Sequence, residues 1–253
     1  MTAWPDGYDR VVLDEVDSTN AEAVRRAPGL SGPTWIMARS QTAARGRRGR
    51  AWAMPPGNFA ATLVLHPDEP PETVALRSFV AALALFDALV AVTGRAEILA
   101  LKWPNDVLLN GGKLAGILLE SLGHGRGVSH LAIGIGVNLT AAPGAETLER
   151  NAARPVALGD ETGTSVTPET FLTSLAEAYA AWENRFATFG FAPIREAWLA
   201  RAAKLGEHIV ARTSDAEITG VFETIDKTGA LVLGTAGGRV AIPAADIYFQ
   251  RGP

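Results

Sequence analysis

The spacing of apolar residues divides this chain into two parts. Short apolar runs that end at turn residues predict strands over residues 10–16, 35–39, 58–65, 98–103, 107–109, 113–120 and 129–139. Longer runs with helical spacing predict helices over residues 72–93, 168–189 and 193–203, after a short helix that follows Asp17. Beyond Gly206 the pattern changes to short strands over residues 208–213, 216–226, 230–235 and 239–249. We therefore expect an α+β domain with a mixed, mainly antiparallel sheet over residues 1–204 and a small β-barrel domain over residues 205–253.

Composition narrows the class of protein. The chain has 253 residues, 47% of them hydrophobic, a formal net charge of -4 and no cysteine, which excludes disulfides and cysteine nucleophiles. The N-terminus lacks the basic and apolar regions of a secretory signal. The apolar run from Val80 to Val92 contains Asp87 and is too short to span a bilayer. These features predict a cytoplasmic enzyme that does not bind membranes.

Several common catalytic signatures are missing from the sequence. It contains no P-loop, no dinucleotide-binding glycine pattern, no H-E-x-x-H and no G-x-S-x-G. The histidines His66, His124, His130 and His208 fall on separate predicted elements, so we do not expect a metal site built on imidazole.

The stretch ARGRRGR, Ala44 to Arg50, gives an acidic protein one dense arginine cluster inside a long predicted loop. Guanidinium groups match phosphate and carboxylate oxygens in bidentate pairs, and glycines let the backbone fold around such an anion. A solvated basic loop is the simpler interpretation. The flanking Gln41 and Trp52, which add an amide and a large apolar surface, favour anion binding.

Two further segments carry candidate chemistry. In KWPND, Lys102 to Asp106, a proline follows a strand and places Asn105 and Asp106 at its end, although Pro-Asn-Asp is also ordinary turn chemistry. In KLAGIL, Lys113 to Leu118, a lysine at a strand start is followed by Gly116, which leaves room beside the strand. An exposed lysine in a hairpin is the alternative.

Taken together, these segments resemble the catalytic region of biotin protein ligases. The resemblance is carried in chain order by DSTN (Asp17 to Asn20), QTAARGRRGRAW (Gln41 to Trp52), KWPND, KLAGIL, GIGVN (Gly134 to Asn138) and, in the tail, IDKTGAL (Ile225 to Leu231). It covers almost the whole chain, and the pairing of the arginine loop with KWPND is its most specific part. It implies a catalytic domain of the class II aminoacyl-tRNA synthetase-like type and an SH3-like C-terminal barrel.

The resemblance also implies a reaction and its residues. The family joins biotin to ATP with Mg²⁺, releases pyrophosphate, holds biotinyl-5′-AMP and transfers biotin to one lysine of a carrier domain. By similarity, the biotin-binding residues are Ser18, Thr19, Asn20, Gln41, Arg45, Gly46, Arg47, Lys113, Gly116, Gly134 and Gly136. By similarity, the ATP-binding residues are Arg47, Arg50, Trp52, Lys102, Asn105, Lys113 and Asn138. Lys113, Arg47 and Asp106 are the expected catalytic residues, with Asp106 aligning the carrier lysine or binding Mg²⁺.

The chain departs from the family pattern at two places. The family loop usually reads G-R-G-R-R-G, and Ala44 stands here at the first glycine. If that position requires a positive φ, alanine would weaken loop closure by about 1 kcal/mol or more, and otherwise the change is neutral. Many bacterial members carry an N-terminal helix-turn-helix domain, for which no room precedes Arg10. We therefore expect a ligase without repressor function or DNA binding.

The expected partner is the biotin carboxyl carrier protein of acetyl-CoA carboxylase or a related carboxylase, and a homodimer is left open. Three other functions are considered. A lipoate protein ligase also forms an acyl-adenylate, and a non-catalytic biotin sensor would bind its ligand without releasing pyrophosphate. A nucleic-acid-binding module using the arginine loop is disfavoured by the net negative charge.

Overall fold

The computed structural model describes residues 3–123, 128–144, 153–213, 216–243 and 245–249. Its larger sheet has seven strands in the order β1-β2-β3-β7-β6-β5-β4. These strands are β1 (Asp9–Val16), β2 (Thr34–Gln41), β3 (Phe59–Leu65), β4 (Leu99–Lys102), β5 (Asp106–Leu109), β6 (Gly112–Leu122) and β7 (His130–Val137). Strands β1 and β2 pair in parallel and the other neighbours are antiparallel, so the predicted mixed, mainly antiparallel sheet is confirmed.

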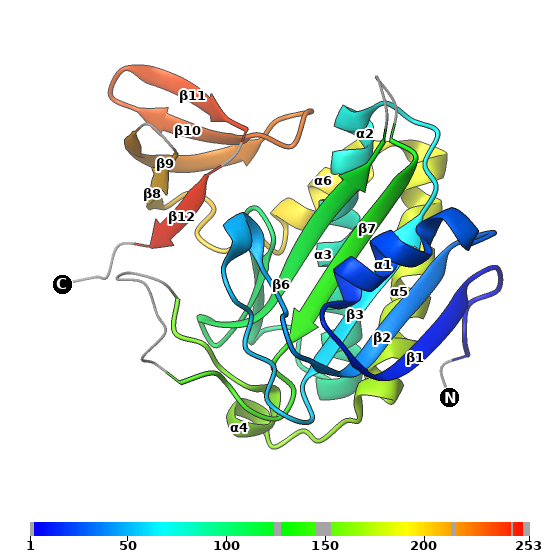
Figure 1. Cartoon of the computed structure of the whole chain (residues 1–253). Coiled ribbons are helices and arrows are strands. Elements are labelled where there is room, and N and C mark those ends of the chain that lie inside the picture. The colour runs from blue at the N-terminus through cyan, green and yellow to red at the C-terminus, as the bar shows by residue number, and fades with distance from the viewer. Residues whose placement is uncertain (1–2, 124–127, 145–152, 214–215, 244, 250–253) are drawn as a thin grey trace.

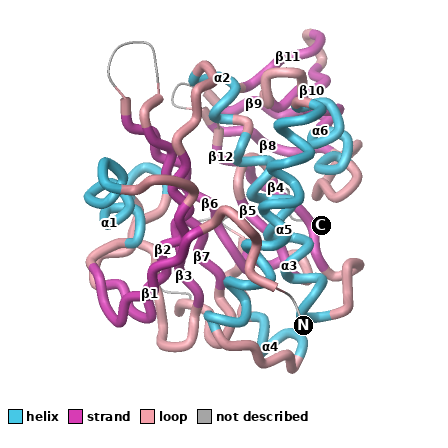
Figure 2. Tube along the Cα trace, turned by 90° about the vertical axis from the view of Figure 1, so that its right-hand side faces the viewer, coloured by secondary structure: helices cyan, strands magenta, loops and turns pink. Residues whose placement is uncertain are grey.

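Helices cover both faces of this sheet. They are α1 (Thr19–Arg26), α2 (Pro71–Ala75), α3 (Arg77–Thr93), α4 (Leu158–Thr162), α5 (Pro168–Phe189) and α6 (Phe191–Leu199), with short 3₁₀ turns at Ala27–Gly29 and Arg47–Gly49. Helix α1 packs on one face, and α3 and α5 pack on the other (Figure 2). The central strand β3 is buried at every position, which fits a strand covered on both sides.

The predicted helix over residues 72–93 is divided in the structure. Leu76 and Phe79 donate their backbone N–H groups to carbonyls three residues back, at 3.1 and 3.0 Å, which tightens the chain into a 3₁₀ turn between α2 and α3. The segment Pro71–Thr93 is long and apolar enough to cross a membrane, but 67% of its most apolar window is buried inside the structure. Such burial is typical of the core helix of a globular domain.

The chain after α6 forms a second, antiparallel sheet of five strands in the order β11-β10-β9-β8-β12. They are β8 (His208–Arg212), β9 (Glu217–Ile225), β10 (Leu231–Thr235), β11 (Gly238–Ile242) and β12 (Asp246–Phe249). The predicted last strand, 239–249, is two strands, because Pro243 lacks the N–H that a continuous ladder would need. No ladder joins β11 to β12 among the described residues, so the SH3-like barrel stays a prediction, and residues 250–253 lie outside the description.

The smaller sheet is tied to the larger domain by specific contacts. Trp103, only 3% exposed, donates its indole N–H to the backbone oxygen of Gly229 at 3.1 Å. Gly229 lies in the turn of the IDKTGAL segment, with a φ of 85° and its Cα facing Phe79 of α3. This attachment places β12 beside the arginine loop of the larger domain (Figure 1).

Candidate active site

A cavity of about 590 Å³ lies between the large sheet, the arginine loop and β12. Every residue that the sequence assigned to a binding or catalytic role lines it. It also contains residues that were not predicted, among them Ala60, Pro155, Asp246, Ile247 and Tyr248. Segments that are far apart in the sequence therefore meet at one place, as the family resemblance implies.

The polar end of the cavity is built at the start of α1. Ser18 occupies the N-cap position of α1, but its side chain makes no capping hydrogen bond, so capping does not explain why a serine stands there. The backbone N–H of Thr19 donates to Oε1 of Gln41 at 2.7 Å, and the Thr19 hydroxyl lies 3.2 Å from the same oxygen. Thr62 of β3 is fully buried and contacts both Thr19 and Asn20. Sequence reasoning missed Thr62, because it looks like any other residue of a buried strand.

The glycines of β6 and β7 make room for side chains of the site itself. A Cβ atom at Gly134 would lie 2.1 Å from Oδ1 of Asn20, and one at Gly136 would lie 2.7 Å from the Trp52 indole. The indole also covers Gly116, at 3.3 Å from the equivalent position. The family resemblance places these glycines among the biotin-binding residues, and in this structure the space above them holds Asn20 and Trp52. Any ligand that contacts the sheet at Gly136 requires the indole to move.

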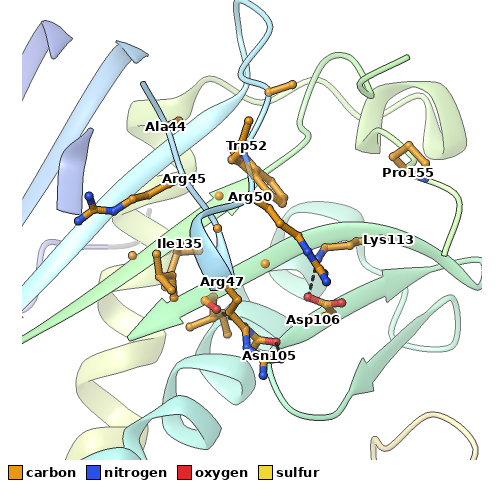
Figure 3. Close-up of a pocket in the computed structure, with 18 of the residues that line it drawn as sticks. Ala44, Arg45, Arg47, Arg50, Trp52, Asn105, Asp106, Lys113, Ile135 and Pro155 are labelled. Atoms are coloured by element: carbon orange, nitrogen blue, oxygen red, sulfur yellow. Dashed lines mark hydrogen bonds and ion pairs between the residues drawn. The ribbon is translucent and has the colours of Figure 1, made fainter. Parts of the chain in front are cut away.

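Lys113 and Asp106 form an ion pair inside the cavity. Lys113 is the second residue of β6 and Asp106 is the first residue of β5. Their charged atoms are 2.7 Å apart (Figure 3). The ammonium group also lies 5.7 Å from the centre of the Trp52 ring. Asn105 is held by the strand behind it, because its side-chain amide donates to the backbone oxygen of Ile117.

The arginine loop is folded by backbone hydrogen bonds. Gly46 N–H donates to the Arg50 oxygen at 2.7 Å, and Arg45 and Ala51 form an isolated antiparallel bridge. Positive φ angles occur in the loop at Arg48, with 57°, and at Gly49, with 71°. Ala44 is not among the described residues with positive φ, so no left-handed strain arises there. The neutral alternative for Ala44 is the one that the structure supports.

The loop arginines point to different partners. Arg45 extends away from the Lys113–Asp106 pair (Figure 3) and lies 3.1 Å from Glu120. Arg48 and Arg50 pair with Asp246 of β12 at 2.8 and 3.1 Å, and Arg47 lies 3.7 Å from the same carboxylate. Asp246 was missed because nothing in the sequence links it to a loop almost 200 positions earlier, a separation of 198 residues from Arg48.

The cavity is electrostatically suited to an anion. Burial lowers the pKa of Lys102, and the neighbouring cations Lys113 and Arg47 act in the same direction against the pull of Asp106 and Asp246. Burial also lowers the pKa of the Arg47 guanidinium. Because a bound phosphate would offset both penalties, these groups favour a ligand that carries several negative charges.

Asn138 also lines the cavity and is buried, with 2% of its surface exposed. Its amide nitrogen donates to the Val156 oxygen at 3.1 Å, and its amide oxygen lies 3.4 Å from Asn58. The side chain is thus oriented by two neighbours, and its expected part in ATP binding stays a prediction.

The described residues form no metal site built on protein ligands alone. His66 and His130, predicted to be dispersed, meet edge to face with ring centres 4.6 Å apart. His124 lies outside the described residues. Within the part of the chain that the structure describes, no three histidine, aspartate or glutamate side chains are grouped to hold a metal ion.

Comparison with known proteins agrees with this geometry. The model of the Biotin/lipoate A/B protein ligase family matches residues 12–138, and the model of the Biotin protein ligase C terminal domain matches residues 204–250. A biotin--[acetyl-CoA-carboxylase] ligase from Paracoccus denitrificans is 60% identical over 94% of this chain and 99% of its own length. The bifunctional ligase/repressor BirA from Bacillus subtilis is 32% identical over 94% of this chain and 73% of its own length.

Among solved structures, the biotin protein ligase from Aquifex aeolicus in complex with biotin and ATP is similar along nearly the whole chain. It is 26% identical, has a TM-score of 0.82, and the similarity covers 96% of this chain and 99% of that one. The likeness spans both sheets, so the fold around the cavity is shared with a protein solved in complex with biotin and ATP.

Proposed function

This chain belongs to the biotin protein ligase family, and we propose that its cavity joins biotin to ATP and passes the biotinyl group to a lysine of a carrier domain. The ligase activity itself follows from the high identity to a ligase of this family. The observation that carries the residue-level proposal is the meeting of the arginine loop, Lys113–Asp106 and the polar pocket around Thr19 in one cavity.

The first step brings two anions together. A carboxylate oxygen of biotin attacks the α-phosphorus of ATP, the bond to the bridging oxygen breaks, and pyrophosphate leaves with that electron pair. In this proposal Lys113 contacts both the biotin carboxylate and the α-phosphate, and Arg47 and Arg50 contact the phosphates, as the family resemblance implies. Their positive charges reduce the repulsion and stabilise the charge that develops on the leaving group.

The second step consumes the mixed anhydride. The amine of the carrier lysine attacks the acyl carbon, the bond to the phosphate oxygen breaks, and AMP leaves. The lysine must lose a proton to become a nucleophile. Asp106 is the carboxylate nearest to Lys113, so it is our candidate for aligning the incoming amine, and Trp52 is our candidate for excluding water from the adenylate.

Mg²⁺ fits this site as part of the nucleotide complex. Asp106 and Asp246 are the carboxylates of the described cavity lining, and both already pair with cations. Mg²⁺ commonly uses one or two carboxylates together with substrate phosphates. As the alternative to aligning the carrier amine, Asp106 is the residue that would hold the ion, which would supply additional charge neutralisation on the phosphates.

The test is pyrophosphate release from ATP, with biotin or lipoate added separately, with and without Mg²⁺ and an apo carrier domain. We expect release that requires both biotin and Mg²⁺, followed by biotin on the carrier lysine. Release with lipoate alone would instead indicate a lipoate ligase. Tight biotin binding without release would indicate a sensor and would contradict the catalytic assignments.

The partner that we propose is the biotin carboxyl carrier protein of acetyl-CoA carboxylase, since the relatives from Paracoccus denitrificans and Mycobacterium tuberculosis are named as ligases of that carboxylase. A homodimer, a cytoplasmic location and the lack of DNA binding stay predictions. So does the division into domains at residues 204 and 205, which coincides with the start of the matched C-terminal domain at residue 204.

Replacing Ala44 by glycine is expected to leave the KM for biotin within about twofold of the wild-type value. Ala44 is not in the left-handed region, so glycine relieves no strain there and adds only freedom to the unfolded chain. Steady-state pyrophosphate release at varied biotin measures the effect. A KM that falls about tenfold would mean that the loop is strained at Ala44 in solution.

A further inference from the structure

Glu120 touches two parts of the site that the sequence treated separately. It lies on β6 and its carboxylate accepts a hydrogen bond from the Asn20 side-chain amide at 2.7 Å. The same carboxylate pairs with Arg45 of the arginine loop, with Nη2 at 3.1 Å from one oxygen and 3.2 Å from the other. Its side chain is 31% exposed, so it stands at the rim of the polar pocket rather than in the core.

The contact with Glu120 fixes which way the Asn20 amide faces. A carboxylate only accepts hydrogen bonds, so the amide nitrogen must face Glu120. The amide oxygen then faces the Thr62 hydroxyl, which lies 2.6 Å away. Turning the amide around would place its oxygen against the Glu120 carboxylate, where neither atom can donate. Its nitrogen would then face the Thr62 hydroxyl, which is already in contact with Thr19. Asn20 is only 4% exposed, so water cannot easily compensate for that loss.

The direction set at Asn20 is passed on to Thr19. Thr62 has one hydroxyl hydrogen and must give it to the Asn20 oxygen, which leaves its own oxygen as an acceptor. The Thr19 hydroxyl lies 2.9 Å from that oxygen and 3.2 Å from Oε1 of Gln41, which is also an acceptor. Whether it donates to Thr62 or to Gln41, the Thr19 hydroxyl gives its hydrogen to a protein oxygen. Its lone pairs then remain available to accept a hydrogen bond from a ligand in the cavity. The pocket therefore offers an acceptor, which suits the N–H groups of a ureido ring.

We infer that Glu120 is a positioning residue of the biotin site, setting the direction of the hydrogen bonds from Asn20 through Thr62 to Thr19 and linking this pocket to the loop through Arg45. The inference rests on the proposed function, because it takes biotin as the ligand of the polar pocket. Glu120 acts through Asn20 and Arg45 and need not touch biotin itself.

Glu120→Gln and Thr62→Val test the two ends of this chain of hydrogen bonds. A glutamine at position 120 can donate as well as accept, so it no longer determines which way the Asn20 amide faces. A valine at position 62 keeps the shape of threonine but lacks its hydroxyl. Each variant is expected to weaken biotin binding about tenfold, the usual scale for one buried hydrogen bond. Calorimetry without ATP gives the biotin Kd. Pyrophosphate release gives the KM for biotin, which should rise about as much as the Kd, while the KM for ATP should stay within about twofold.

Matched variants separate positioning from damage to the fold. Thr62→Ser keeps the hydroxyl and should bind biotin like the wild type. Glu22→Gln makes the same change of charge on α1, where Glu22 pairs with Arg25 and Arg26 away from the cavity, and should also bind normally. The double variant Glu120→Gln with Thr62→Val should lose less than the product of the single losses, since both act on Asn20.

Unchanged biotin affinity in Glu120→Gln would overturn the inference, and so would equal losses in Thr62→Ser and Thr62→Val. A rise in the KM for ATP that matches the rise for biotin would also overturn it. Thermal unfolding identifies any variant that fails to fold, and Glu120→Gln, on a partly exposed side chain, carries the test if Thr62→Val does not fold. Wild-type protein that neither binds biotin nor releases pyrophosphate with it would contradict the proposed function instead.

Discussion

Replacing Lys113 by alanine is expected to lower kcat/KM for biotin-dependent pyrophosphate release by roughly 10²- to 10³-fold, the range found when one charge-stabilising donor is removed from an active site. Lys113 is held 2.7 Å from Asp106 in the cavity, at the place where we propose that the two substrate anions meet. Its removal also leaves the Asp106 carboxylate facing those anions without its partner, which adds to the loss.

The matched control is Lys204→Ala, which removes a lysine from an exposed pair with Glu207 and should leave the rate unchanged. Lys113→Arg keeps the charge but not the compact shape and should recover only part of the rate. Steady-state and single-turnover pyrophosphate release measure both variants. A Lys113→Ala enzyme with less than a fivefold loss would contradict the role that we give to this residue.

The Arg47→Ala variant is expected to raise the KM for ATP about 10- to 100-fold, because one charge-assisted contact to phosphate contributes about 1.5–3 kcal/mol. Arg47 belongs to the loop and lines the cavity, and burial lowers the pKa of its guanidinium, a penalty that an arriving phosphate would offset. Its loss should therefore act mainly on the nucleotide.

Arg39→Ala provides the control for this prediction. Arg39 is an exposed arginine paired with Asp14 and Glu169, outside the cavity lining. It should leave the KM for ATP unchanged in the same pyrophosphate assay. If Arg47→Ala altered only the KM for biotin, the proposed contact of Arg47 with the phosphates would be wrong.

Those parts of the fold that depend on local signals were predictable. Helix α5 was predicted over 168–189 and is found at Pro168–Phe189, because Thr167 caps its start, Pro168 occupies the first turn and Gly190 ends it. The Asn110–Gly111 turn between β5 and β6 follows an equally local rule, since Asn-Gly is the pair that best adopts the positive φ angles that both residues have. Where the spacing of apolar residues is clear and capping residues mark both ends, the local sequence is enough to predict the element and its bounds.

The parts that depend on distant partners were not predictable. The break at Leu76 arises where the α2–α3 junction packs against the Gly229 turn, more than a hundred residues later in the chain. Glu120 and Asp246 look like ordinary surface acids in the sequence, and only the fold brings them to Asn20, Arg45 and Arg48. The site residues that were predicted came from a family resemblance, whereas their contacts follow from the packing of the two sheets.

The hydrogen bond from Trp103 to Gly229 has a consequence for how such proteins can be recombined. The KWPND segment contacts both parts of the protein. Asp106 lines the cavity, while the indole of Trp103 is buried under a turn of the smaller sheet. A chimera that exchanged the last fifty or so residues would need a turn that still fits Trp103 and an acid that still meets the arginines. The two sheets are separate pieces of architecture, yet the sequences that build them are constrained to change together.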